Sequence, residues 1–545
     1  MDWTPEAYRD YGLKPSVDPV PIPNGPRDVA SALDAGVATR PDAEALVGRY
    51  DRFNFRDYDR AVNAAAAFLW DLGVRPGDRL AASAANHPEI VLAFFAAMRL
   101  GAIWVGINRR LAPAEKRYLL RDAGVGVLLA EDEVLKEILG STEDLGLSAI
   151  VSLQPDDPAS DWRRGLAAHA GAQRPTVAID PWAPAAIAYT SGTTGFPKGA
   201  VHSQHNIMLV PAVAQDEIDP AVLAARRYGT TTPLTILNLM ILGPVAAARA
   251  QAAHICMDRV DSVGVAEWIG REKISVTNCA PTTAFDMLTR DDIRPEDLSS
   301  LELLSIGGST VPERLPALYL ERFGCMPRVG YGLTEAPTGV SSSEGGADRP
   351  AGEIGLPQPQ LEIEILDDEG NAVPTGSSGE ICVRAVRTGP FAGLYRPALG
   401  YWRNAEATDR LLRGGWLHTG DVGFKNAEGI LHIQDRRTDV IIRGSSNIYP
   451  AEVERVLRLS DRVADCAVMG KPDARLGQVV VAFVQPIRAS EDGAALVSEL
   501  AALCTENLAR YKNPVEWHVI DEMPRNAAGK IVKPRLRERL AGEPA

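Results

Sequence analysis

The first third of the chain alternates helix-like and strand-like segments, and this alternation limits the fold more than any other feature. Residues 61–72 carry an apolar helical face that stops at Gly73. Residues 88–100 repeat the pattern, with Asn86 as the expected cap. Short apolar runs such as 126–130 fit strands. Strands that alternate with helices predict an α/β fold in which helices cover mainly parallel sheets.

The sequence pattern changes after residue 355. Leu361, Ile363 and Ile365 alternate with glutamates, as in a strand with one buried face. Residues 379–384 and 431–433 continue this pattern between turns. The segment therefore predicts a smaller, mostly antiparallel β unit.

A mixed pattern of helix and strand returns beyond Asp435. A helix is expected to begin at Pro450, and residues 479–484 resemble a buried strand. No Gly/Ser-rich linker separates the two parts, which favours a hinge over a flexible tether. A chain of 545 residues is also too long for one core. We expect a large N-terminal domain, residues 1–435, and a small mobile α+β C-terminal domain, residues 436–545.

Composition narrows the class of protein. The net charge of −14 argues against nucleic acid as the main partner, because phosphate backbones select basic surfaces. Six cysteines without a C-x-x-C pair favour buried reduced thiols over a disulfide framework or a Cys-based zinc site. The sequence has no signal-peptide pattern and no apolar stretch of ~18 residues. We therefore expect no membrane span and a cytoplasmic location.

A loop rich in glycine and hydroxyl groups follows the strand-like residues 185–189. Its glycines let backbone N–H groups turn toward an anion, its hydroxyls add donors, and its lysine adds a positive charge. The P-loop pattern G-x-x-x-x-G-K-[ST] does not fit it, and a flexible surface loop would not require this order of residues. We predict a phosphate-binding loop formed by Thr190, Ser191, Gly192, Thr193, Thr194, Gly195, Phe196, Pro197 and Lys198.

This loop resembles the signature of the adenylate-forming superfamily, in its acyl-CoA synthetase (AMP-forming) branch. Further segments resemble the other motifs of that superfamily and follow in the same order. They are an adenine-and-magnesium motif at 330–335, a ribose motif at 415–421, a hinge region at 435–439 and 447–454, and a C-terminal lysine motif at 524–530. Several ordered motifs are far more specific than any one of them.

The resemblance implies that a carboxylic acid attacks the α-phosphate of ATP, that pyrophosphate leaves, and that coenzyme A then receives the acyl group. Because the substrate supplies the nucleophile, the protein must supply positioning and charge. Lys530 is expected to bridge the carboxylate and the α-phosphate. Glu335 is expected to hold Mg²⁺, and Thr334 to donate to the α-phosphate. Asp421 can accept hydrogen bonds from both ribose hydroxyls.

The remaining nucleotide contacts also come from the resemblance. Tyr331 is expected to stack on adenine, where Gly332 allows a close approach. Arg436 is expected to hold ribose or phosphate, although a surface ion pair with Asp435 or Asp439 would also fit. The full set of expected ATP and CoA contacts is Thr190, Ser191, Gly192, Thr193, Thr194, Gly195, Lys198, Gly308, Ser309, Tyr331, Gly332, Thr334, Asp421, Arg436, Gly444 and Lys530.

Three departures from the family pattern concern domain rotation and the acid. The hinge position, usually Asp or Lys, is Thr438, and Gly444 is followed by Ser445 in place of a second glycine. Many relatives carry Phe-His where this chain has Thr235-Ile236. This change predicts a more apolar pocket and a hydrophobic aliphatic, alicyclic or aryl acid. The expected acyl-pocket residues are Thr235, Ile236, Asn238, Gly307, Gly330 and Pro337.

Other functions remain open at this point. The acceptor of the acyl group could be a carrier protein, although the chain ends shortly after Lys530 and no attached carrier domain is expected. A luciferase-like oxygenase and a non-catalytic nucleotide-binding protein are further alternatives. His202 and His205 are expected to be structural, because no third metal ligand accompanies them. By resemblance, a homodimer is expected.

Overall fold

The computed structural model describes residues 3–138, 145–190, 196–307, 311, 315–343, 350, 352–436, 440–444, 446–487, 493–524 and 531–541. The chain divides into two compact units. The first contains residues 1–109, 119–189 and 199–435, and the second contains residues 110–118, 190–198 and 436–545. The mobility of a domain of residues 436–545 that carries Lys530 remains a prediction.

One sheet of the fold is mostly parallel. Among the described residues its strands lie in the order β18-β8-β7-β4-β3-β5-β6, and β3, β4, β5, β6 and β7 pair in parallel. Its strands are β3 (Arg79–Ser83), β4 (Ile103–Gly106), β5 (Val127–Ala130), β6 (Ala149–Ser152), β7 (Pro184–Thr190), β8 (Lys198–Ser203) and β18 (Gly400–Tyr401). The helix–strand alternation therefore builds the parallel sheet that it predicts.

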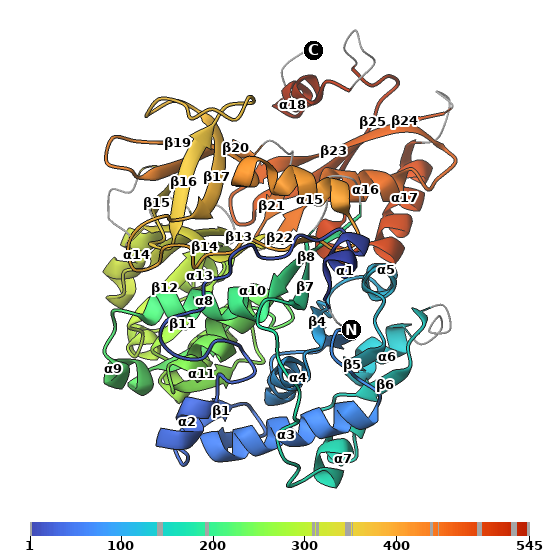
Figure 1. Ribbon diagram of the computed structural model, residues 1–545. Coiled ribbons are helices and arrows are strands. Elements are labelled where there is room, and N and C mark those ends of the chain that lie inside the picture. The colour runs from blue at the N-terminus through green and yellow to red at the C-terminus, as the bar shows by residue number, and fades with distance from the viewer. Residues whose placement is uncertain are drawn as a thin grey trace. The chain divides into compact units, whose positions relative to one another are not determined.

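The helices α3 (Phe55–Asp71) and α4 (Pro88–Arg99) lie side by side, and α4 packs against β3 and β4 of this sheet (Figure 1). α3 begins earlier than the apolar pattern predicted, because the Asn54 side chain accepts a hydrogen bond from the backbone N–H of Asp57. The expected cap of α4 was wrong. Asn86 instead donates to the carbonyls of Thr230 and Thr232, so it holds a distant loop.

A larger sheet contains thirteen strands among the described residues, in the order β16-β17-β19-β20-β15-β14-β13-β12-β11-β9-β10-β1-β2. The strands β9 to β13 and β1 form its parallel part. The bounds of these strands are β1 (Glu44–Val47), β9 (Arg227–Thr230), β10 (Ala253–Cys256), β11 (Val276–Cys279), β12 (Leu303–Gly307) and β13 (Arg328–Leu333). The edge strand β2 (Arg52–Asn54) pairs antiparallel with β1.

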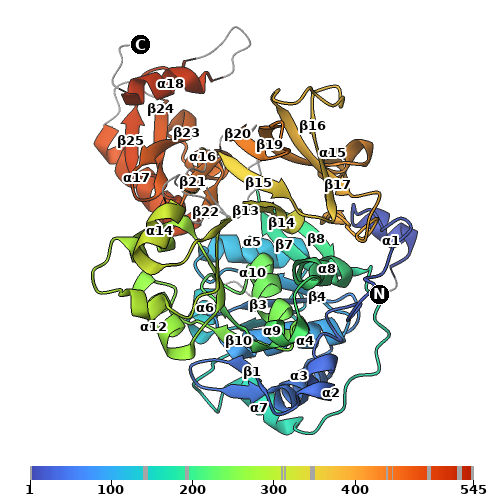
Figure 2. The ribbon, with the colours of Figure 1, turned by 90° about the vertical axis from the view of Figure 1, so that its left-hand side faces the viewer.

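The antiparallel strands predicted after residue 355 are present, and Figure 2 shows several of them as a yellow and orange group. They are β14 (Ala336–Ser343), β15 (Glu353–Pro357), β16 (Leu361–Leu366), β17 (Gly379–Ala385), β19 (Leu417–Lys425) and β20 (Leu431–Arg436). These strands belong to the same sheet as the parallel strands. β14 pairs with both β13 and β15, so hydrogen bonds continue from the parallel part into the antiparallel part.

α4 belongs to the hydrophobic core of the first unit. Every residue of α4 is buried, including Phe94 and Phe95, each of which stabilises the fold by about 1.5–3 kcal/mol through burial. The other helices are α1 (Pro5–Asp10), α2 (Asp34–Thr39), α5 (Pro113–Ala123), α6 (Asp132–Ile138), α7 (Asp161–Ala168), α8 (Gln204–Gln215), α9 (Pro220–Ala225), α10 (Leu237–Met240), α11 (Ala246–Arg249), α12 (Ser262–Glu272), α13 (Pro281–Leu288), α14 (Leu315–Phe323) and α15 (Ala405–Leu411).

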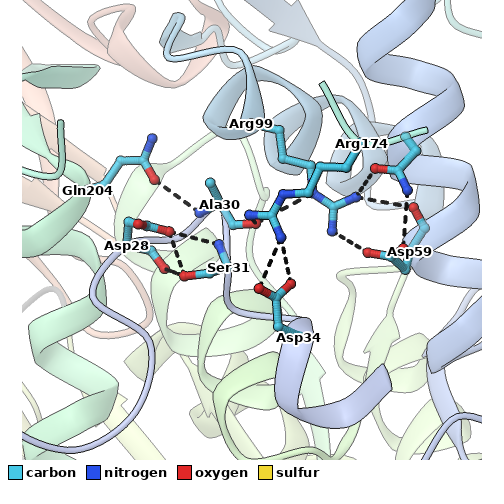
Figure 3. A network of polar contacts seen from close by, with 9 residues as sticks. Asp28, Ala30, Ser31, Asp34, Asp59, Arg99, Arg174 and Gln204 are labelled. Carbon is cyan, nitrogen blue, oxygen red and sulfur yellow. Dashed lines mark hydrogen bonds and ion pairs between the residues drawn. The ribbon is translucent and has the colours of Figure 1, made fainter. Parts of the chain in front are cut away.

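A polar network fastens the N-terminal segment to this core (Figure 3). The backbone N–H of Ala30 donates to the Gln204 amide over 3.0 Å, and the Ala30 carbonyl accepts from Arg99 and Arg174. Arg99 has a fully buried side chain and forms an ion pair with Asp59. A buried guanidinium needs such partners because an unpaired buried charge is costly. The network therefore fixes a segment that has little regular secondary structure.

The second unit has its own sheet and core. Its strands lie in the order β22-β21-β24-β23, with β25 paired to β24. Figure 2 shows this sheet in orange and red. Its elements are β21 (Ile441–Arg443), β22 (Ser446–Ile448), α16 (Pro450–Leu457), β23 (Val463–Asp473), β24 (Gly477–Pro486), α17 (Gly493–Asn507), β25 (Glu516–Val519) and α18 (Lys533–Ala541). The α/β class predicted for the chain is confirmed.

Two expectations from composition can be compared with the structure. All six cysteines are buried and free, as predicted. Among the described residues, no helix is long and apolar enough to cross a bilayer.

Candidate active site

The predicted adenine and ribose motifs meet in the first unit. Tyr331 lies on β13 and Asp421 on β19, ninety positions apart in the sequence. The Tyr331 hydroxyl donates to the Asp421 carboxylate over 2.5 Å, and both residues are buried. An ionised carboxylate offers about four lone pairs, so it can accept several hydrogen bonds at the same time. Tyr331 therefore orients the group expected to bind ribose.

The turn around Asp421 is built from local contacts. Gly420 has a φ of +75°, a left-handed conformation that favours glycine. Its N–H donates to Glu380, and the backbone N–H of Asp421 donates to the Thr419 hydroxyl over 3.1 Å. Thr419 in turn donates to the Ile381 carbonyl. These bonds attach the ribose motif to β17 and set the direction of the Asp421 side chain.

A possible metal-binding combination lies beside this turn. The ligand atoms of Glu380, Cys382 and His418 lie within 4.8 Å of one another. However, the Glu380 carboxylate already accepts from His418, Arg413 and the N–H of Gly420. Burial raises the pKa of Cys382 to about 12, so its thiol stays protonated. The three side chains therefore act as hydrogen-bonded support for the ribose motif.

Glu335, the expected magnesium ligand, has a partner that the sequence did not indicate. The Tyr401 hydroxyl donates to a Glu335 carboxylate oxygen over 2.6 Å, and the backbone N–H of Ala398 donates to the Glu335 carbonyl. The carboxylate is half-buried. A half-buried carboxylate is a donor type that Mg²⁺ accepts together with phosphate oxygens. The Glu335 carboxylate is therefore a suitable ligand for this ion, and the hydrogen bond from Tyr401 holds its side chain in position.

His202 holds the neighbouring residue of the same motif. Its Nε2 lies 2.8 Å from the Thr334 carbonyl, and the ring is fully buried. Burial lowers the pKa of His202 to about 4, so the ring is neutral and Nε2 carries the proton that it donates. His205 similarly donates to the Leu394 carbonyl. The structural roles expected for both histidines are confirmed.

Buried neutral histidines make the stability of the fold depend on pH. Burial lowers the pKa of His202 and His205 to about 4 and that of His254 to about 3. Below about pH 6.5 these histidines become protonated in the unfolded chain but stay neutral in the folded protein, so the free energy of unfolding decreases as the pH decreases. Each histidine should remove about 2 kcal/mol of the free energy of unfolding between pH 7 and pH 5.

The pH effect can be measured by urea-induced unfolding at the two pH values. The three histidines together lower the free energy of unfolding between pH 7 and pH 5. In a His254→Gln variant this decrease should be smaller by about one third. His87 affects the pH dependence of stability in the opposite direction. Burial alone would lower its pKa, but hydrogen bonds to Glu131 and Glu89 outweigh burial and raise the pKa to about 8. The stability that protonated His87 contributes to the folded state is fully present below about pH 6.5 and is lost as the pH rises through 8. An unchanged pH dependence in His254→Gln would contradict this explanation.

The expected acyl-pocket residues gather at the carboxyl ends of the parallel strands of the large sheet. Gly307 on β12 and Gly330 on β13 are partners in register. A side chain at Gly307 would come within 2.8 Å of the Gly330 carbonyl, whereas one at Gly330 would enter open space. Thr235 and Ile236 precede α10, which carries Asn238, and Pro337 lies on β14. The structure thus has open space beside Gly330, at the end of the sheet where the expected acyl pocket lies.

The other predicted positions are only partly described. Thr190 ends β7 and Lys198 begins β8, so these two residues flank the predicted phosphate loop. Gly444 has a φ of +62°, which suits glycine. The side chain of Arg436 and residues 191–195, 308, 309, 438 and 530 lie outside the described part of the structure. Their expected roles remain predictions.

Comparison with known proteins identifies the family. The family model of AMP-binding enzymes matches residues 33–395, and the model of the AMP-binding enzyme C-terminal domain matches residues 452–530. The chain belongs to the AMP-binding enzymes. It is an adenylate-forming ligase of the acyl-CoA synthetase branch, as the ordered motifs predicted.

Similar proteins agree over nearly the whole chain. An indoleacetate–CoA ligase of Aromatoleum aromaticum is 34% identical, covering 94% of this chain and 98% of its own. A feruloyl-CoA synthase of an Amycolatopsis species is 33% identical, with coverages of 92% and 96%. The solved structure of an amide bond synthetase from Marinactinospora thermotolerans superimposes with a TM-score of 0.80 at 26% identity, covering 94% of this chain and 99% of its own. The similarity therefore extends over nearly the whole length of this AMP-binding enzyme.

Proposed function

We propose that this protein activates an aryl or arylalkyl carboxylic acid as its acyl-adenylate and transfers the acyl group to coenzyme A. The observation that carries the proposal is the hydrogen bond from Tyr331 to Asp421, because Tyr331 lies on β13, which leads directly into the Thr334-Glu335 motif. This pairing supports binding of a ribonucleotide next to a phosphate-binding segment. The acid class rests on the open space at Gly330 and on the likeness to ligases named for indoleacetate and ferulate.

The first half-reaction follows from the chemistry of the substrates. A carboxylate oxygen of the acid attacks the α-phosphorus of ATP, a new P–O bond forms, and the bond to pyrophosphate breaks. Lys530 stabilises the negative charge that gathers around phosphorus, and Thr334 donates to an α-phosphate oxygen. Asp421 holds the ribose hydroxyls and Arg436 the ribose or phosphate. Glu335 would hold Mg²⁺, which neutralises phosphate charge when it is bound.

The second half-reaction needs a different arrangement of the same groups. The thiol of coenzyme A attacks the acyl carbonyl, a thioester bond forms, and AMP leaves with the electron pair of the broken acyl–phosphate bond. We propose that rotation about Thr438 removes Lys530 and brings Gly444 toward the pantetheine chain, a domain motion of the hinge type. The assembly is proposed to be a homodimer.

The proposal is tested by a screen of carboxylic acids in the presence of ATP, Mg²⁺ and coenzyme A, with AMP release as the measurement. Aryl and arylalkyl acids should give the highest rates. ATP–pyrophosphate exchange without coenzyme A isolates the first half-reaction. Failure of every acid to support exchange would contradict the adenylation step. Exchange without thioester formation would point to a different acceptor, such as a carrier protein.

A further inference from the structure

Three buried polar atoms close to the expected acyl site have no hydrogen-bond partner among the residues that the structure describes. They are the Thr235 hydroxyl oxygen and the amide oxygens of Asn238 and Asn278. Thr235 is only 5% exposed. Folded proteins rarely leave such atoms unpaired, because each one costs about 1–3 kcal/mol. Other unpaired atoms, such as the Tyr58 hydroxyl on α3 and the Trp162 indole nitrogen on α7, lie in the helical core instead.

The fold brings these three residues to one end of the large sheet. Asn278 lies at the carboxyl end of β11, and its carbonyl accepts from the Thr231 hydroxyl over 2.6 Å. Thr231 begins the loop that leads through Thr235 to α10 and Asn238. This loop turns sharply, because the N–H of Ile236 donates to the Pro233 carbonyl. The loop is therefore bonded directly to the strand that carries the third unpaired oxygen.

The strand register gives the direction of the Asn278 side chain. Asn278 pairs with Ser305, and Ile306 and Cys279 face the core on the opposite side of the sheet. Side chains alternate between the two faces of a sheet, so Asn278, Gly307 and Gly330 share the other face. Open space adjoins Gly330 on that face. Asn278 was not among the residues predicted from the sequence, because a single Asn at a strand end is common.

The position of the loop is held from several sides. The Asn86 amide donates to the carbonyls of Thr230 and Thr232 and accepts from the N–H of Leu234 over 2.8 Å. The Thr235 carbonyl lies so close to β4 that a side chain at Gly106 would approach it to 2.0 Å. Such a fixed backbone favours a ligand group as the missing partner, because these contacts hold the loop in its observed position.

We propose that Thr235, Asn238 and Asn278 form an acceptor end of the acyl site that selects acids carrying a hydrogen-bond donor, a ring hydroxyl or a ring N–H, in addition to the carboxylate. This inference rests on the proposed function and specifies its substrate. The donor satisfies acceptors that are otherwise buried and unpaired. A site built in this way rejects an isosteric acid that lacks the donor, since binding would leave the acceptors unpaired.

The test compares matched acids that differ only in the donor. Suitable pairs are 4-hydroxycinnamate with 4-fluorocinnamate, and indole-3-acetate with benzothiophene-3-acetate. One of the two pairs will contain the acid that the wild-type enzyme activates faster. Within that pair, kcat/KM for pyrophosphate exchange should be at least about tenfold higher for the acid that carries the donor. Asn238→Leu and Asn278→Leu should each lower that ratio toward one, mainly by slowing the donor-bearing acid. Thr235→Val should act in the same direction.

The matched control is Thr277→Val, on the same strand as Asn278 but on the face that packs against the core. Its hydroxyl donates to the Gly229 carbonyl and lies 3.5 Å from the backbone carbonyl of Asn278, so the variant loses backbone contacts but removes none of the three side-chain oxygens of the proposed acceptor end. The ratio should remain at the wild-type value, and because it is a ratio, partial loss of folded enzyme does not change it. Equal rates for both acids of each pair, or a preference that survives in Asn238→Leu and Asn278→Leu, would overturn the inference.

The two proposals fail in different ways. If no acid of the screen supports exchange, the proposed function itself is wrong. If acids are activated but the best ones lack a second donor, the function stands and the acceptor end is wrong. Water molecules that pair with the three oxygens would give this second result.

Discussion

A Lys530→Ala variant should lose acyl-adenylate formation by about 10²- to 10³-fold, while it still converts supplied acyl-AMP and coenzyme A into thioester. The ammonium group is expected to stabilise charge that develops around the α-phosphorus, and this charge exists only in the first half-reaction. ATP–pyrophosphate exchange measures the first step, and the release of AMP from synthetic acyl-AMP measures the second.

The control for Lys530 is Arg535→Ala. Arg535 is an exposed cation on α18, five positions further along the chain, and its removal changes the local charge by the same amount. Arg535→Ala should retain both half-reactions. If Lys530→Ala lost both half-reactions equally, the residue would be acting on the domain as a whole. If exchange survived in Lys530→Ala, its proposed role would be wrong.

The second large effect is expected at Asp421. Asp421→Ala removes the acceptor for the ribose hydroxyls and leaves the Tyr331 hydroxyl without its 2.5 Å partner. Hydrogen bonds to a charged group are worth about 1.5–3 kcal/mol each, so kcat/KM for ATP should fall by about 10²-fold or more. The decisive measurement is the ratio of rates with ATP and with 2′-deoxy-ATP. The wild-type enzyme should prefer ATP, and the variant should lose this preference.

Tyr331→Phe separates the two parts of this contact. It keeps the ring that is expected to stack on adenine and removes only the hydroxyl that orients Asp421. The preference for ATP over 2′-deoxy-ATP should weaken but persist, with a smaller loss in kcat/KM than in Asp421→Ala. Asp367→Ala, in an exposed turn between β16 and β17, is the matched acidic control and should change neither value. An Asp421→Ala enzyme that still prefers ATP would exclude a ribose role.

Local patterns were sufficient for most of the elements in this chain. The helices predicted at 61–72 and 88–100 and the strands predicted at 126–130 and around 361–365 match observed elements apart from their ends, because a buried helical face and a buried strand face repeat at fixed intervals. Predictions failed where a side chain could form either a local hydrogen bond or one to a distant part of the chain. Asn86 fits a helix cap by position, but its amide is used to hold the loop at Thr230–Thr232, which only the packed chain brings within reach.

The ordered motifs around residues 190–198, 330–335, 415–421 and 524–530 were enough to predict an adenylate-forming enzyme, because they resemble the motifs of that superfamily and follow in the same order. The partners of these motifs could not be predicted. Tyr331 with Asp421, Glu335 with Tyr401, and His202 with Thr334 join segments that are far apart in the sequence. Which of these segments meet depends on strand order and on the crossing connections between strands, and a pattern of period two or 3.6 carries no information about either. The same reason explains why the unpaired oxygens of Thr235, Asn238 and Asn278 emerged as one acceptor end only from the packed sheet.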